Sequence, residues 1–119
     1  MNTEQNQVKV VTDESLEAAV KRFRQNSYWR GVYDNAPEKA KRLYALQFWP
    51  SVNVDLYDRC KEEFHPLVRA AQAALGVADL EYLIEHTSSN GMAARARAHY
   101  RELLAAAKER EDATVSPQF

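Results

Sequence analysis

The sequence predicts an all-α fold, a compact single domain of five to six helices. Ala, Glu, Lys, Arg and Leu dominate the composition, and these residues have the highest helix propensities. Only three glycines and four prolines interrupt the 119 residues, which is few for a protein built from many short strands. Apolar residues recur at spacings of three and four, the period of a helix with one buried face. A chain of this length can bury a core without metal ions or disulfide bonds, and its single cysteine excludes an internal disulfide.

The first two helices are predicted from the residues at their ends. Thr12 is a good N-cap, acidic residues follow it, and basic residues occupy the last turn, as the helix dipole favours. A narrow apolar stripe at helical spacing is formed by Leu16, Val20 and Phe23. The pair Asn26-Ser27 ends this helix and caps the next one, which covers about residues 28–34.

A third helix is predicted from Pro37 to Phe48. Proline is favoured in the first turn of a helix. Pro50 is expected to end the helix, because proline cannot donate the next backbone hydrogen bond. The first half of the segment is polar and the second half is apolar. Trp49 lies at the apolar end, so we expect its side chain to be buried.

Residues 53–75 form the longest periodic stretch and predict one long helix. Pro66 lies inside this stretch and removes one backbone hydrogen bond, so we expect a kink near residues 63–65 and not a loop. Gly76 is a natural residue to end the helix. The apolar stripe of the helix consists of Leu56, Cys60, Phe64, Leu67, Ala71 and Ala74.

Two more helices complete the domain. A short one is predicted over residues 79–86, and a longer one follows the TSSNG loop and covers about residues 91–110. The helical domain is thus predicted over residues 12–111, between a flexible N-terminal arm (1–11) and a flexible C-terminal tail (112–119). The residues expected to be buried in the last helix are Met92, Ala96, Tyr100, Leu103 and Ala107.

Aromatic and basic residues are concentrated in one segment. Residues 20–50 hold seven Lys and Arg against two Asp and Glu, although the whole chain has a net charge of -1. The helix predicted at 28–34 is too short to bury its tryptophan, its two tyrosines and its valine together, so at least one ring should stay exposed. Trp, Tyr and Arg are the residues most enriched at binding hot spots, and we therefore predict a partner-binding surface here. Its candidate residues are Tyr28, Trp29, Arg30, Tyr33, Lys39 and Arg42.

Other polar residues carry weaker signals. Glu62 and His65 have the Glu-x-x-His spacing of di-iron bundles, but that site needs two copies of the motif and the sequence has one. Either His86 or His99 could act as a general base, yet no nucleophile or orienting carboxylate accompanies them at a recognisable spacing. The sequence therefore predicts no metal site, no cofactor and no catalytic set. One further basic sector, for which a solvated helix surface is the simplest interpretation, consists of Arg97, Arg101 and Lys108.

Residues 65–97 resemble the helical C-terminal segment of the glutamate–cysteine ligase-like carboxylate–amine ligases. They read HPLVRAAQAALGVADLEYLIEHTSSNGMAARAR, and a similar helix, loop and arginine-bearing helix occur in that family. The resemblance covers under a third of this chain and implies a helical conformation for these residues. It carries no activity and no residue role to this chain, because the catalytic domain of the ligases could not fit within it.

These features favour a non-enzymatic interaction protein that docks on a partner protein as an adaptor or inhibitor, such as the small inhibitors that phages and mobile elements carry. The expected location is cytoplasmic, because no apolar run is long enough for a signal peptide or a membrane span. A second hypothesis is a single-stranded nucleic acid or nucleotide binder that uses the basic segment 20–50. A third is a small helical enzyme that uses His86 and His99.

Overall fold

The computed structural model describes residues 9–115, which form a single all-α domain of seven helices without a strand. The predicted fold class is thereby confirmed. The helices are α1 (Asp13–Phe23), α2 (Ser27–Asp34), α3 (Glu38–Val52), α4 (Val54–Arg59), α5 (Lys61–Ala73), α6 (Val77–Glu85) and α7 (Ala93–Val115).

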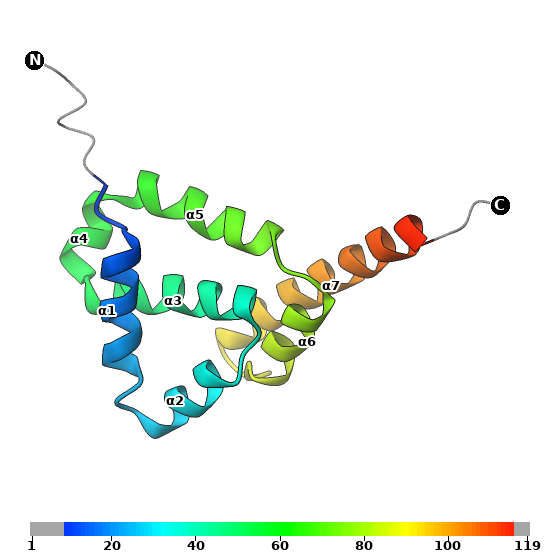
Figure 1. Cartoon of the computed structure of the whole chain (residues 1–119), viewed down its shortest axis with the longest axis horizontal. Coiled ribbons are helices and arrows are strands. Elements are labelled where there is room, and N and C mark those ends of the chain that lie inside the picture. The colour runs from blue at the N-terminus through cyan, green and yellow to red at the C-terminus, as the bar shows by residue number, and fades with distance from the viewer. Residues whose placement is uncertain (1–8, 116–119) are drawn as a thin grey trace, which may run out of the picture.

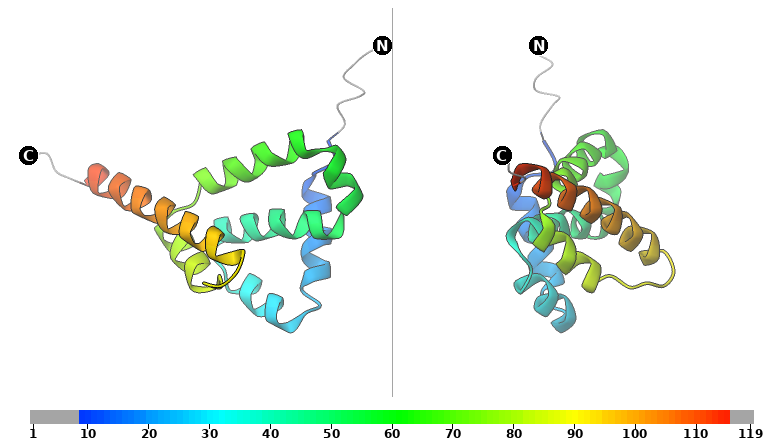
Figure 2. Two further views of the ribbon diagram at one scale, coloured as in Figure 1. Left: turned by 180° about the vertical axis from the view of Figure 1, so that it is seen from behind. Right: turned by 90° about the vertical axis from the view of Figure 1, so that its right-hand side faces the viewer.

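Helix α3 lies at the centre of the molecule (Figure 1). α1 crosses it near the end that leads into α4, while α2 and α5 lie on opposite sides of it (Figures 1 and 2). α6 packs against the other end of α3, and α7 packs against α6. The C-terminal half of α7 extends past the other helices (Figure 2). α3 therefore forms the framework on which the other elements are placed.

The core is built mainly from α3, whose second half is apolar except for the exposed Gln47 and Ser51. Trp49 is completely buried, as predicted, and its ring stacks on Phe64 of α5 with 5.7 Å between the centroids. At the other end of the molecule, Leu80 and Leu83 of α6 are also fully buried. Burial of large apolar side chains is the main force that holds these helices together. The buried residues of α3 are Ala40, Leu43, Tyr44, Ala45, Leu46, Phe48 and Trp49.

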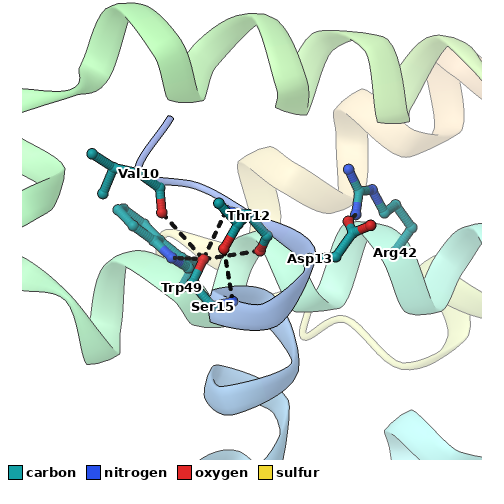
Figure 3. Close-up of polar contacts among 6 residues, drawn as sticks. All are labelled: Val10, Thr12, Asp13, Ser15, Arg42 and Trp49. Atoms are coloured by element: carbon teal, nitrogen blue, oxygen red, sulfur yellow. Dashed lines mark hydrogen bonds and ion pairs between the residues drawn. The ribbon is translucent and has the colours of Figure 1, made fainter. Parts of the chain in front are cut away.

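The predicted caps of the first two helices are present. Thr12 Oγ1 accepts a hydrogen bond from the Ser15 amide, and Ser15 Oγ accepts one from the Thr12 amide, which makes a reciprocal capping box (Figure 3). Asn26 Oδ1 accepts hydrogen bonds from the amides of Tyr28 and Trp29 at 2.9 and 3.2 Å. Local sequence signals thus determine where α1 and α2 begin.

Three expectations about helix ends are wrong. α3 continues through Pro50 to Val52, so that proline does not end it. The predicted long helix over residues 53–75 is broken at Cys60, whose φ of -130° and ψ of 31° leave the helical region, and α4 and α5 result. Gly76 does not cap α5, which ends at Ala73, but precedes α6. The segment around Cys60 contains neither proline nor glycine, so no local signal marks this break, and both α4 and α5 pack on α3. Pro66 lies within α5 and not in a loop, as expected.

Described residues lie on both sides of the predicted domain 12–111. Val11 is buried, and the amides of Val10 and Val11 donate hydrogen bonds to the carboxylate of Glu63 on α5. At the other end, α7 continues to Val115. The rest of the predicted arm and tail, residues 1–8 and 116–119, lies outside the described residues. None of the helices in the described part of the chain is both long and apolar enough to cross a membrane.

Candidate functional site

The structure separates the six predicted partner-binding residues. Tyr28 and Trp29 line one groove, between α2, α3 and the start of α7. Tyr33 and Arg42 line a different groove, between α1 and α3. Lys39 and Arg30 are exposed and line neither. The aromatic and basic residues of segment 20–50 thus lie on two surfaces, and these surfaces differ in chemistry.

We call the first of these the tyrosine groove. Its volume is about 500 Å³, within the range of small-ligand and peptide side-chain pockets. Helices α2 and α3 contribute four of its residues, the turn after α6 contributes three, and Met92 and the N-terminal part of α7 contribute the rest. Its lining consists of Tyr28, Trp29, Tyr44, Gln47, His86, Thr87, Ser88, Met92, Ala93, Ala96 and Tyr100.

Two large apolar side chains at this groove are open to solvent. Tyr28 is 58% exposed and Met92 is 88% exposed. The exposure of Tyr28 confirms that α2 cannot bury all of its rings, whereas the expectation that Met92 is buried is wrong. Met92 follows Gly91, whose φ of +62° is a left-handed conformation that favours glycine, so the chain turns just before α7. Met92 therefore lies ahead of the first turn of α7 and not on its packed face.

Trp29, the second aromatic residue of the groove, is mainly a structural residue. It is half-buried, and four rings pack edge-on against its indole at centroid distances of 5.2 to 6.2 Å. Edge-to-face contacts of this kind stabilise aromatic clusters. The rings belong to Phe23, Tyr28, Tyr44 and Phe48. Tyr28, at the edge of this cluster, is consequently the ring with most of its surface free for a partner.

The floor of the groove contains two buried tyrosines. The Gln47 side-chain amide donates a hydrogen bond to Tyr100 Oη at 2.8 Å. Tyr44 is only 4% exposed, and its hydroxyl is the one buried side-chain polar atom without a hydrogen-bond partner among the described residues. Burial raises the pKa of Tyr44 well above its ordinary value, and the nearby phenols of Tyr82, Tyr100 and Tyr28 raise it further. The Tyr44 hydroxyl therefore stays protonated at neutral pH and is free to donate.

The two histidines of the third hypothesis are in different surroundings. His86 lines the tyrosine groove, with its ring 4.1 Å from the ring of Tyr82. His99 is exposed on α7, 3.9 Å from the carboxylate of Glu102, and does not line the groove. The hydroxyls of Thr87 and Ser88, which follow His86, already make local hydrogen bonds. Thr87 donates to a backbone carbonyl of α6, and Ser88 accepts from the Asn90 amide. The arrangement supplies no activated nucleophile next to a base.

We call the second groove the α1–α3 groove, and most of its basic residues are paired with carboxylates. Its volume is about 570 Å³. Arg42 lies 3.3 Å from Asp13, an ion pair that is visible in Figure 3. The Arg24 guanidinium makes two hydrogen bonds to Asp34, at 2.8 and 2.7 Å, and lowers the pKa of that carboxyl. Lys41 lies 3.9 Å from Glu38, so three of the seven basic residues in segment 20–50 are paired with carboxylates.

The remaining candidate residues from the sequence lie outside both grooves. Arg97 donates to the Ile84 carbonyl at 3.1 Å, so it does not form a free basic sector with Arg101 and Lys108. His65 contacts the hydroxyl of Tyr57 at 3.0 Å. Cys60 is half-buried, and burial raises the pKa of its thiol. Within residues 9–115, no three His, Cys, Asp or Glu side chains are placed so that they could share a metal ion.

Comparison with known proteins gives no match: no family model, no curated protein and no solved structure is significantly similar to this chain. The resemblance of residues 65–97 to the carboxylate–amine ligases receives no support from these comparisons. The site must therefore be interpreted from its own geometry.

Proposed function

We propose that the protein is a non-enzymatic interaction protein that docks on a partner protein through the tyrosine groove, as an adaptor or an inhibitor. The observation that carries this proposal is the exposure of Tyr28 and Met92 on one groove. Soluble proteins expose few large apolar side chains together unless a partner covers them. Tyr and Met are also enriched in protein interfaces, Tyr as a rigid anchor and Met as an adaptable contact. The expected cytoplasmic location belongs to this proposal.

The single-stranded nucleic acid hypothesis has less support. Such binders stack successive bases on several free aromatic faces within a basic groove. In the tyrosine groove the faces of Trp29 are surrounded by other rings, which leaves Tyr28 as the exposed ring. In the α1–α3 groove the arginines are paired with Asp13 and Asp34. Neither surface offers the several free aromatic faces that stacking of successive bases requires.

The test is a pull-down from host extract, with nuclease treatment, followed by affinity measurements on the captured protein with three variants. We expect Tyr28→Ala and Met92→Ala each to weaken binding at least about tenfold while the melting temperature stays within about 2 °C. Val54→Ala is the matched control, because Val54 is 61% exposed and lies on neither groove. Equal affinity of all three variants, or loss of capture after nuclease treatment, contradicts the proposal.

A further inference from the structure

The charges of α7 are arranged against its helix dipole. The first nine residues of the helix, 93–101, contain three arginines and no acidic residue. The next eleven residues, 102–112, contain four acidic and two basic residues. Acidic residues stabilise the N-terminal end of a helix and basic residues the C-terminal end, so both halves carry the less favourable sign. Positive charge is thereby concentrated where α7 begins.

This beginning of α7 forms one wall of the tyrosine groove. Met92, Ala93 and Ala96 all line the groove, and no Asp or Glu is among the lining residues. Arg95 is exposed in the first turn of α7, and no ion pair neutralises it in the described structure. No side-chain oxygen of residues 9–112 caps this end of the helix, and Met92, the residue before it, cannot do so. Arg95 itself does not line the groove, but it is adjacent in sequence to Ala96, which does, so the positive charge lies at the rim of the groove and has no counter-charge among the lining residues.

A second, independent observation concerns the floor of the same groove. The Tyr44 hydroxyl is buried without a partner, although Tyr44 itself lines the groove. An unsatisfied buried polar group lowers stability unless it has a use, and such groups deserve a functional explanation. Because this hydroxyl is buried in the free protein, an acceptor would have to enter between the lining side chains to satisfy it. Both observations call for an occupant that supplies acceptors and negative charge.

We infer that the tyrosine groove takes a short acidic segment of a partner protein, with apolar side chains that cover Tyr28 and Met92 and carboxylates beside Arg95 and the start of α7. This inference rests on the proposed docking function and names the chemistry of the partner. The volume of the groove, about 500 Å³, accommodates a few side chains and not a whole folded domain. Apolar contacts supply the affinity, and the charges select against basic segments.

The experiment selects short linear peptides from a random display library on the full-length protein and measures the affinity of the enriched peptides. We expect enriched sequences that combine aromatic or aliphatic residues with Asp or Glu. Tyr28→Ala should weaken their binding at least about tenfold, and Val54→Ala should leave it unchanged. Arg95→Glu should also weaken binding at least about tenfold.

Two variants separate the inferred chemistry from loss of folding. Arg95→Glu should keep or raise the melting temperature, because a carboxylate in the first turn complements the helix dipole. Tyr44→Phe should keep or raise the melting temperature too, since the removed hydroxyl has no partner in the free protein, while peptide affinity falls roughly three- to tenfold. Lys108→Glu is the charge control, because it lies about 20 Å along α7 from Arg95, beyond the range of screened charges.

The outcomes distinguish this inference from the docking function. Enrichment of uncharged or basic peptides that depend on Tyr28 supports docking but overturns the acidic partner. Full affinity for either Arg95→Glu or Tyr44→Phe also overturns it. If no enriched peptide depends on Tyr28, both the inference and the docking function are wrong. Displacement of peptide by single-stranded oligo(dT), or a dimer in light scattering that Tyr28→Ala dissociates, assigns the groove to nucleic acid or to a second copy and overturns the inference.

Discussion

The indole Nε1 of Trp49 donates a hydrogen bond to Ser15 Oγ at 3.0 Å (Figure 3). Ser15 is also the third residue of α1 and closes the capping box with Thr12. One hydroxyl therefore satisfies the only polar group of the most deeply buried tryptophan and helps to begin the helix that covers it. This contact links the buried side chain of Trp49 to the start of α1, although the two residues are 34 positions apart.

Ser15→Ala should lower the free energy of unfolding by about 2–3 kcal/mol, because it leaves the buried indole N–H unsatisfied and removes half of the capping box. Urea unfolding measures this change. Trp49→Phe removes the other partner, so the effects of the two substitutions should be less than additive in the double variant. Strictly additive effects would show that the hydrogen bond contributes nothing. Ser51→Ala, an exposed serine of α3, is the control and should change little.

Three aromatic residues of α2 and α3 should contribute differently to stability. Trp49→Ala should cost about 3–5 kcal/mol, because Trp49 is completely buried. Trp29→Ala should cost roughly 1–3 kcal/mol, since Trp29 is half-buried but packs against four rings. Tyr28→Ala should change stability by about 0.5 kcal/mol or less. Thermal unfolding of the three variants gives this order, and a Tyr28→Ala variant as unstable as Trp29→Ala would contradict the assignment of Tyr28 to the binding surface.

The carboxylate of Asp79 joins the starts of two helices. It accepts a hydrogen bond from the Gly76 amide at 2.8 Å, at the start of α6, and another from the Ala40 amide at 3.3 Å, in the first turn of α3. Asp79 is buried, so Asp79→Ala should lower the free energy of unfolding by about 2–4 kcal/mol. Asp79→Asn keeps an acceptor oxygen and should cost less. Equal losses for the two variants in urea unfolding would show that hydrogen-bond acceptance is not the basis of the effect.

The pair of Arg24 and Asp34 should make stability depend on pH. The hydrogen bonds from Arg24 lower the pKa of Asp34 in the folded protein, so this contribution is present above the unfolded pKa of about 3.9. This contribution to stability is lost as the pH falls through the lower pKa that Asp34 has in the folded protein. The difference in melting temperature between the unaltered protein and Asp34→Asn should therefore be positive at pH 7 and disappear in strong acid. Arg24→Gln should remove the same pH dependence, and a difference that persists unchanged in strong acid would refute this explanation.

The sequence by itself determined the fold class and the starts of the first helices. Thr12 and Asn26 cap α1 and α2 as predicted, because a cap bonds to amides only two or three residues away. Burial of Trp49 was also predictable, since Trp49 lies in the apolar second half of α3 beside Phe48. Exposure of a ring in α2 followed from its composition, because a helix of 8 residues cannot turn three aromatic rings and a valine toward the core together. Each of these features could be predicted from the residues of one element.

Only the tertiary structure decided the site. The tyrosine groove combines residues of α2, α3 and α7, so its members are up to 72 positions apart and no local pattern marks Tyr44, Met92 or Tyr100 as neighbours of Tyr28. The break at Cys60 and the continuation of α3 through Pro50 likewise differ from what local preferences predict, and both lie where helices pack on one another. Arg42 pairs with Asp13 of α1 and not within its own helix. Local hydrogen bonds and side-chain volumes can be read along a chain, but the contacts that assemble a groove are made between distant segments and depend on how the whole core packs.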